Sequence, residues 1–233
     1  MGKDVIIACD FSSAEDTYRF LDRFKGNTPF VKIGMELYYA AGPDIVRELK
    51  KRGHSIFLDL KLHDIPNTVK KSMAVLSRLD IDMVNLHAGG TKAMMKAAME
   101  GLSSGNGRRP LLLAVTILTS IDEASLHEDL LITAPVKDTV IHYAKNAADS
   151  GLDGVVCSPL EAAMVHDACG SAFLTVTPGV RFADGDIGDQ KRVMTPEAAN
   201  RAGSDYIVVG RPITAADDPE AAYLRCMEEF TRS

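Results

Sequence analysis

The sequence lacks the features that mark a membrane-spanning, disulfide-bonded or zinc-binding protein. Its four cysteines form no C-x-x-C pair, and their spacing matches neither a zinc site nor a disulfide framework. No apolar run approaches the roughly 18 residues that a membrane span needs. Met1 to Asp4 lead almost directly into a strand-like segment, so we expect no signal peptide. These absences favour a cytoplasmic protein with reduced thiols.

An excess of positive charge is also lacking. The formal net charge is -6 and the pI is about 5.5, which argues against a general nucleic-acid-binding or anionic-membrane surface. A local cationic pocket for a small anion remains compatible with this charge. The 233 residues, of which 46% are hydrophobic, contain no low-complexity segment, short repeat or obvious linker. We therefore expect one domain over residues 1–233, a length at which barrels fold as single units.

Short apolar runs alternate with longer amphipathic ones along the whole chain. The eight apolar runs are 5–9, 30–33, 55–60, 83–86, 111–116, 154–156, 173–176 and 206–209. Helical patterns follow them at 13–24, 44–51, 68–78, 91–102, 136–150, 159–168, 196–202 and 219–230. Nearly continuous hydrophobicity is typical of parallel strands covered on both faces. The pattern predicts an α/β protein with a (β/α)8 TIM barrel, and a doubly wound open sheet is the alternative.

Charged residues gather where the first three predicted strands end. Asp59 and Lys61 are two residues apart, so strand alternation predicts that their side chains share the inner face. Asp10 and Lys32 end the first and second strands and would join them at the same rim. A buried ion pair that only fixes register is the alternative interpretation. Since active sites of such barrels form at the carboxyl ends of the strands, we favour a catalytic network.

These residues resemble a known family. The motif D-x-K-x-x-D-I-P-x-T, which begins at Asp59, and Lys32 within F-V-K-I-G resemble the orotidine 5′-phosphate decarboxylase family. The segments M-E-L after Gly34 and V-T-I-L-T-S from Val115 resemble its bacterial branch, and the resemblance extends from the first strand to Arg211. It implies decarboxylation of orotidine 5′-monophosphate (OMP) to uridine 5′-monophosphate (UMP) without a cofactor or a metal.

The resemblance also implies a role for each charged residue. Lys61 would stabilise a carbanion at carbon 6 of the pyrimidine and protonate it, while Asp59 would repel the substrate carboxylate. Lys32 and Asp64 would orient and balance these charges. Asp64 lies past the strand end, and its sequence position leaves open whether it serves its own pocket. The family implies a homodimer in which Asp64, Ile65 and Thr68 complete the partner's site.

Two segments after the seventh and eighth strands suit a phosphate group. Barrels often bind phosphate between these loops, and arginine offers a planar fork to its oxygens. By resemblance, the substrate-binding residues here are Pro178, Arg181, Gly210 and Arg211. The segment 182–190 is expected to be a mobile lid whose Gln190 contacts the ligand. Thr119 would contact the base, with Thr116 as the alternative, and Asp10 and Asn67 would bind ribose hydroxyls.

Other interpretations remain open beside this one. Magnesium-dependent sugar-phosphate enzymes similar to hexulose-phosphate synthase share the fold and the D-x-K-x-x-D motif, but Lys32 stands where they carry an acid, and a lysine is poorly suited to hold a cation. A non-catalytic nucleotide-binding barrel is a second alternative. His63 lies inside the motif, but the proposed chemistry needs no general base. His87 ends the fourth strand and is expected to support the pocket.

Overall fold

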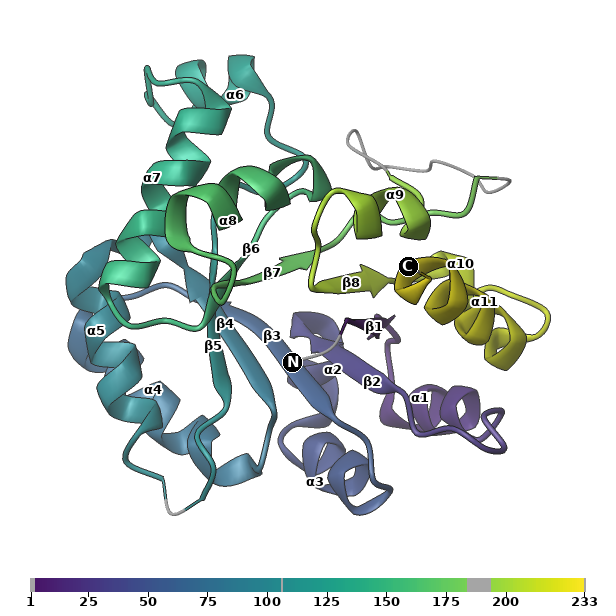
Figure 1. Ribbon diagram of the computed structural model, residues 1–233. Coiled ribbons are helices and arrows are strands. Elements are labelled where there is room, and N and C mark those ends of the chain that lie inside the picture. Colours follow the sequence, from purple (N-terminus) through teal and green to yellow (C-terminus); the bar gives the residue numbers. More distant parts are fainter. Residues whose placement is uncertain (1–2, 106, 184–193, 233) are drawn as a thin grey trace.

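The strands form a closed barrel in the computed structural model, which describes residues 3–105, 107–183 and 194–232 (Figure 1). Neighbouring strands pair in parallel, and β1 pairs with β8 to close the sheet. The strands are β1 (Asp4–Cys9), β2 (Phe30–Gly34), β3 (Ile56–Leu62), β4 (Met83–His87), β5 (Leu111–Val115), β6 (Gly154–Val156), β7 (Leu174–Thr177) and β8 (Tyr206–Val209). The predicted barrel is confirmed, and the closure between β1 and β8 rules out an open sheet.

Helices cover the outside of the barrel (Figure 1). They are α1 (Ala14–Leu21), α2 (Met35–Ala41), α3 (Asp44–Lys51), α4 (Pro66–Leu76), α5 (Thr91–Leu102), α6 (Glu123–Glu128), α7 (Val136–Asp149), α8 (Ala162–Cys169), α9 (Pro196–Arg201), α10 (Arg211–Thr214) and α11 (Pro219–Thr231). Within the described ranges, no helix is both long and apolar enough to cross a membrane.

Three short helices, α2, α6 and α10, were not predicted. Helix α6 lies between the predicted strand at 111–116 and the predicted helix at 136–150. Asp122 caps it by accepting a hydrogen bond from the backbone N–H of Ser125. Helix α4 begins at Pro66, two residues before the predicted start. Proline suits the first turn of a helix because its missing N–H needs no partner there. Short helices of this kind carry too few turns to show a periodic pattern.

The barrel has two apolar regions, one on each face of the sheet. The outer region lies between strands and helices and includes Leu58, Met73 and Val84. The inner region fills the barrel with side chains from alternate strand positions, as expected for this fold. Its buried members are Ile6, Ala8, Phe57, Met83, Leu113, Val176, Tyr206 and Val208. This packed interior forms the floor on which the polar groups at the carboxyl ends of the strands rest.

Candidate active site

A layer of polar side chains lies directly above the apolar interior of the barrel, because alternate residues of each strand face inward. Two residues after the inward-facing Phe57, β3 presents Asp59, and two residues after Met83, β4 presents Asn85. Lys32 follows Phe30 on β2 in the same way. All three polar side chains are buried. Because buried charges are costly unless they are paired, their partners decide what this layer can do.

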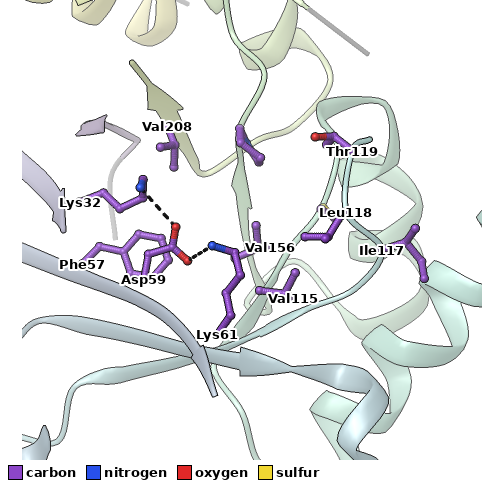
Figure 2. Close-up of a pocket in the computed structure, with 12 residues that line it drawn as sticks. Lys32, Phe57, Asp59, Lys61, Val115, Ile117, Leu118, Thr119, Val156 and Val208 are labelled. Carbon is purple, nitrogen blue, oxygen red and sulfur yellow. Dashed lines mark hydrogen bonds and ion pairs between the residues drawn. The ribbon is translucent and has the colours of Figure 1, made fainter. Parts of the chain in front are cut away.

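The charged groups form a row in which acids and bases alternate. The Lys32 ammonium lies 2.8 Å from Oδ1 of Asp10 and 3.3 Å from Oδ2 of Asp59. The Lys61 ammonium donates to Oδ1 of Asp59 at 2.7 Å. The two lysine ammonium groups therefore lie on either side of the Asp59 carboxylate (Figure 2). The structure brings together the four residues expected at this rim.

Mutual pairing sets the charge states in this row. Burial alone would lower the pKa of Lys32, but the charges of Asp59 and Asp10 outweigh it and the pKa is raised. Burial alone would raise the pKa of Asp59, yet the charges of Lys32 and Lys61, with hydrogen bonds from Lys61 and Asn85, lower it. Both shifts favour the ionised forms, so Lys32 and Asp59 are both charged at neutral pH.

Strand β3 is irregular where it carries these groups. Its pairing with β4 shifts register between Leu58 and Leu62. Lys61 has a φ of 50°, in the left-handed region that residues with a Cβ rarely adopt. The side chains of Asp59 and Lys61 do meet, as expected. Regular strand alternation is not the cause, because the backbone of β3 is irregular between them. A bulge re-aims the chain here, as bulges often do beside active sites.

A cavity of about 190 Å³ opens over the row of charges. Lys32, Asp59 and Lys61 lie on one side of it, and apolar side chains such as Val115 and Val156 line much of the rest (Figure 2). The predicted site residues that line it are Lys32, Asp59, Lys61, Thr119 and Pro178. An apolar pocket with a few convergent charged groups is the usual form of a small-molecule site, and its low polarity strengthens the electrostatic interactions within it.

The two threonines considered for base contact differ in their surroundings. Thr116 is buried, and its hydroxyl donates to the carbonyl of Val156 at 3.0 Å. Thr119 is half-buried and lines the cavity, on the side opposite Lys32 (Figure 2). The geometry therefore favours Thr119 over Thr116 as a group that faces a ligand.

The residues expected to bind phosphate lie where β7 and β8 end. Arg181 is half-buried beside Gly179, whose φ of 81° fits a tight turn. Gly210 precedes α10, which begins at the exposed Arg211. These positions agree with the expected pair of loops at the carboxyl ends of the strands. Gln190 lies outside the described residues, as does most of the segment expected to be a lid.

The segment between β3 and α4 is exposed. The Asp64 carboxylate accepts a hydrogen bond from the Ile65 backbone N–H at 2.6 Å, and Ile65 is 66% exposed. Asn67 and Thr68 are exposed in the first turn of α4. These four predicted residues therefore lie outside the lining of the cavity that contains Lys61.

Two features near the row were missed or left open by sequence reasoning. Asn85 is fully buried, and its amide contacts both Asp59 and the Lys61 backbone. A polar residue within the apolar run 83–86 was the signal available in the sequence. The rings of His63 and His87 are 5.7 Å apart, and burial, with the nearby charges of His63 and Lys61, lowers the pKa of His87. His87 thus stays neutral beside the row.

Among the residues that the structure describes, no cluster of three or more His, Cys, Asp or Glu side chains is arranged to hold a metal ion. The nearest acidic groups at the rim, Asp10 and Asp59, are instead joined through the ammonium of Lys32.

Because Gly34 has no side chain, it leaves room for the side chains of Asp10 and Lys32 in the row of charges. Its φ of −86° suits any residue, but a Cβ there would lie 3.0 Å from Oδ1 of Asp10 and 3.2 Å from Nζ of Lys32. We expect Gly34→Ala to lower kcat by about tenfold, because small displacements of reacting groups are costly. Gly26→Ala, which meets nothing within 4 Å, is the matched control. Steady-state kinetics of both variants test this, and an unchanged kcat for Gly34→Ala would contradict it.

The fold and the site together define a (β/α)8-barrel enzyme with a small-molecule pocket at the carboxyl ends of its strands. Residues 3–226 match the Orotidine 5'-phosphate decarboxylase / HUMPS family, and the chain belongs to that family. The orotidine 5'-phosphate decarboxylase of Geobacillus thermodenitrificans is 55% identical over 228 residues, which cover 97% of this chain and 95% of that protein. The corresponding protein of Bacillus caldolyticus is 57% identical, over 97% of this chain and 93% of that protein.

A solved structure shows the same likeness in three dimensions. The crystal structure of orotidine 5'-phosphate decarboxylase from Lactobacillus acidophilus superposes with a TM-score of 0.89 at 44% identity. The match covers 98% of this chain and 99% of that one. Family membership and the barrel are therefore established independently of the residue roles assigned above.

Proposed function

We propose that this chain decarboxylates OMP to UMP and CO2, the last step of de novo UMP biosynthesis, in the cytoplasm and as one catalytic domain. The family match and the names of relatives more than half identical over nearly the whole chain support this activity. The alternating row of charges over an apolar cavity supports its chemistry.

The position of the Lys32 ammonium carries the proposal. The family name also covers a second branch, and the magnesium-dependent sugar-phosphate enzymes considered above would need carboxylates that converge on a divalent cation. Here the Lys32 ammonium occupies the space between Asp10 and Asp59. A cation at that point would meet a fixed positive charge, whereas an anionic substrate beside Lys32 and Lys61 would be attracted.

The proposed chemistry needs no covalent intermediate. The bond between carbon 6 and the carboxylate breaks, CO2 departs, and the electron pair stays on carbon 6. The Lys61 ammonium stabilises this carbanion and then gives it a proton, which completes UMP. Asp59 would repel the substrate carboxylate until it leaves as neutral CO2. Lys32 holds Asp59 and Asp10 in place throughout.

Binding energy far from carbon 6 would align the ring with these charges. In the proposal, Pro178, Arg181, Gln190, Gly210 and Arg211 bind the phosphate end, Thr119 contacts the base, and Asp10 and Asn67 bind the ribose hydroxyls. Because the phosphate does not react, its contacts serve to orient the reacting carbon and hold the site closed.

We further propose that two copies of the chain form a homodimer with shared sites. Three large apolar side chains that share a surface depression with Lys61 are exposed: Met35, Tyr39 and Val75, at 44%, 72% and 59%. Ile65, four residues after Lys61 in the sequence, is 66% exposed. A surface depression of about 560 Å³ is lined by Tyr39, Val75 and Lys61 among others, so the apolar surface borders the site. Contact there with a second copy would bury these groups and bring the partner's Asp64, Ile65 and Thr68 toward Lys61.

A substrate comparison in the presence of EDTA tests the activity. The purified chain should consume OMP, followed by the loss of its ultraviolet absorbance, at a rate that EDTA leaves unchanged. It should show no turnover of sugar phosphates with or without Mg²⁺. Turnover of a sugar phosphate that EDTA abolishes would assign the chain to the other branch, and binding of UMP without turnover of OMP would make it a nucleotide-binding barrel.

A further inference from the structure

The side chain of Asn85 connects two parts of the active site that the strand ladder leaves unconnected. It is fully buried on β4. Its Nδ2 donates to Oδ1 of Asp59 at 2.7 Å, and its Oδ1 accepts from the backbone N–H of Lys61 at 2.8 Å. One amide therefore contacts both members of the acid–base pair.

The irregular pairing of β3 with β4 explains why an amide is needed there. Leu58 pairs with Val84 and Leu62 with Leu86, so four steps along β3 correspond to two along β4. The extra residues of β3, which include Asp59 and Lys61, bulge out of the regular ladder. Asn85 lies between the two paired residues of β4, where the regular pairing with β3 is interrupted.

The backbone of Lys61 needs such a partner. Its φ of 50° is unfavourable for a residue with a Cβ, and conformations of this kind persist only where the surroundings hold them. The hydrogen bond to the Asn85 side chain gives the Lys61 N–H a partner where the ladder between β3 and β4 is irregular. Without it, a regular extended conformation of β3 would move the Lys61 ammonium.

The second hydrogen bond of Asn85 orients the carboxylate. Oδ1 of Asp59 accepts from both Asn85 and Lys61, while Oδ2 faces Lys32 at 3.3 Å. A carboxylate held at both oxygens cannot rotate to exchange its partners. The donor from Asn85 also helps to lower the pKa of Asp59.

We propose that Asn85 is a positioning residue of the active site: it holds the left-handed bulge that aims the Lys61 ammonium and fixes the orientation of the Asp59 carboxylate. This inference rests on the proposed decarboxylation, in which Lys61 must reach carbon 6. Asn85 touches neither the substrate nor the reacting atoms in this proposal, and acts only through its two neighbours.

Two variants and a matched control separate positioning from mere stability. Asn85→Leu removes both hydrogen bonds at similar volume. Asn85→Asp keeps the acceptor for Lys61 but replaces the donor with a negative charge beside Asp59. Thr175→Val is the control, because Thr175 is also fully buried on a barrel strand and its hydroxyl contacts Asp205 at 3.0 Å, near the amino end of β7.

The readouts are the melting temperature, kcat and KM for OMP, the affinity for UMP, and the pKa of Asp59 from a carbon-13 NMR titration. For Asn85→Leu we expect kcat to fall by about 100-fold, because misplaced reacting groups react more slowly. The affinity for UMP should stay within about threefold of that of the unmodified chain. The pKa of Asp59 should rise in Asn85→Leu and rise further in Asn85→Asp, since a like charge disfavours ionisation. In both variants the acid limb of the kcat/KM profile should therefore move to higher pH. Thr175→Val should lose stability while keeping kcat and the Asp59 pKa.

Two results would overturn the inference. The first is a folded Asn85→Leu variant with kcat within about threefold of the unmodified chain. The second is a fall in kcat and UMP affinity in parallel with an unmoved pKa of Asp59, which would mean a purely structural role. If Asn85→Leu does not fold, Asn85→Asp decides by the same criteria. Absence of OMP turnover in the unmodified chain would overturn the proposed function instead, and the NMR titration would still decide whether Asn85 sets the state of Asp59.

Discussion

Replacing Lys61 by alanine is expected to lower kcat for OMP by about 10⁴-fold or more, because one side chain supplies both carbanion stabilisation and the proton. UMP affinity should change by less than about tenfold, since the lost interaction belongs mainly to the transition state. Steady-state kinetics and a UMP titration measure these two quantities separately.

A second lysine provides the control for this experiment. Lys50 on α3 forms an ion pair of 2.8 Å with Asp82, and the Lys50 side chain is partly buried, as that of Lys61 is. Asp82 lies just before β4, at the end of the barrel opposite the site. Lys50→Ala therefore removes a comparable ion pair and should leave kcat nearly unchanged. Near-normal turnover by a folded Lys61→Ala variant would mean that another group protonates carbon 6.

The barrel was accessible from the sequence because its signals are local. Runs such as 5–9 and 206–209 are apolar throughout, and strands covered on both faces require just that composition. The rim residues Asp10, Lys32 and Asp59 also followed from position alone, since parallel strands that alternate with helices place their carboxyl ends together. These predictions depended only on the order of residues within single segments.

The parts that were missed depend on relations between segments. The left-handed backbone of Lys61 follows from the register of β3 against β4, and no pattern within β3 encodes that register. Asn85 gains its importance only from the bulge on the neighbouring strand. A buried asparagine in an apolar run shows that a polar partner exists, but it does not identify the partner.

The exposed segment after β3 raises the question of which subunit Asp64 serves. Motif spacing puts Asp64 close to Lys61 in sequence, yet its side chain is exposed, as are those of Ile65 and Thr68. An exposed acid followed by an exposed large apolar residue fits contact with a second copy better than a site within one chain. Mixed dimers of inactive variants test this directly.

Heterodimers of Lys61→Ala with Asp64→Ala are expected to recover about half of the unmodified activity, because one of the two symmetric sites then combines an intact Lys61 with the partner's intact Asp64. Each variant alone should be nearly inactive. Two different affinity tags, used in succession, isolate the mixed dimers, and the OMP assay measures their turnover per dimer.

The reciprocal mixture makes the test decisive. The heterodimer of an unmodified chain with the double variant Lys61→Ala/Asp64→Ala carries the same number of intact residues, but both on one chain. Shared sites predict that it is nearly inactive, because the only intact Lys61 faces a partner without Asp64. Sites contained within one chain predict the opposite pattern, with about half of the activity in this dimer and none in the first. Stability effects would lower the activity of both heterodimers alike. Which of the two heterodimers is active therefore depends only on whether Asp64 serves its own site or the partner's.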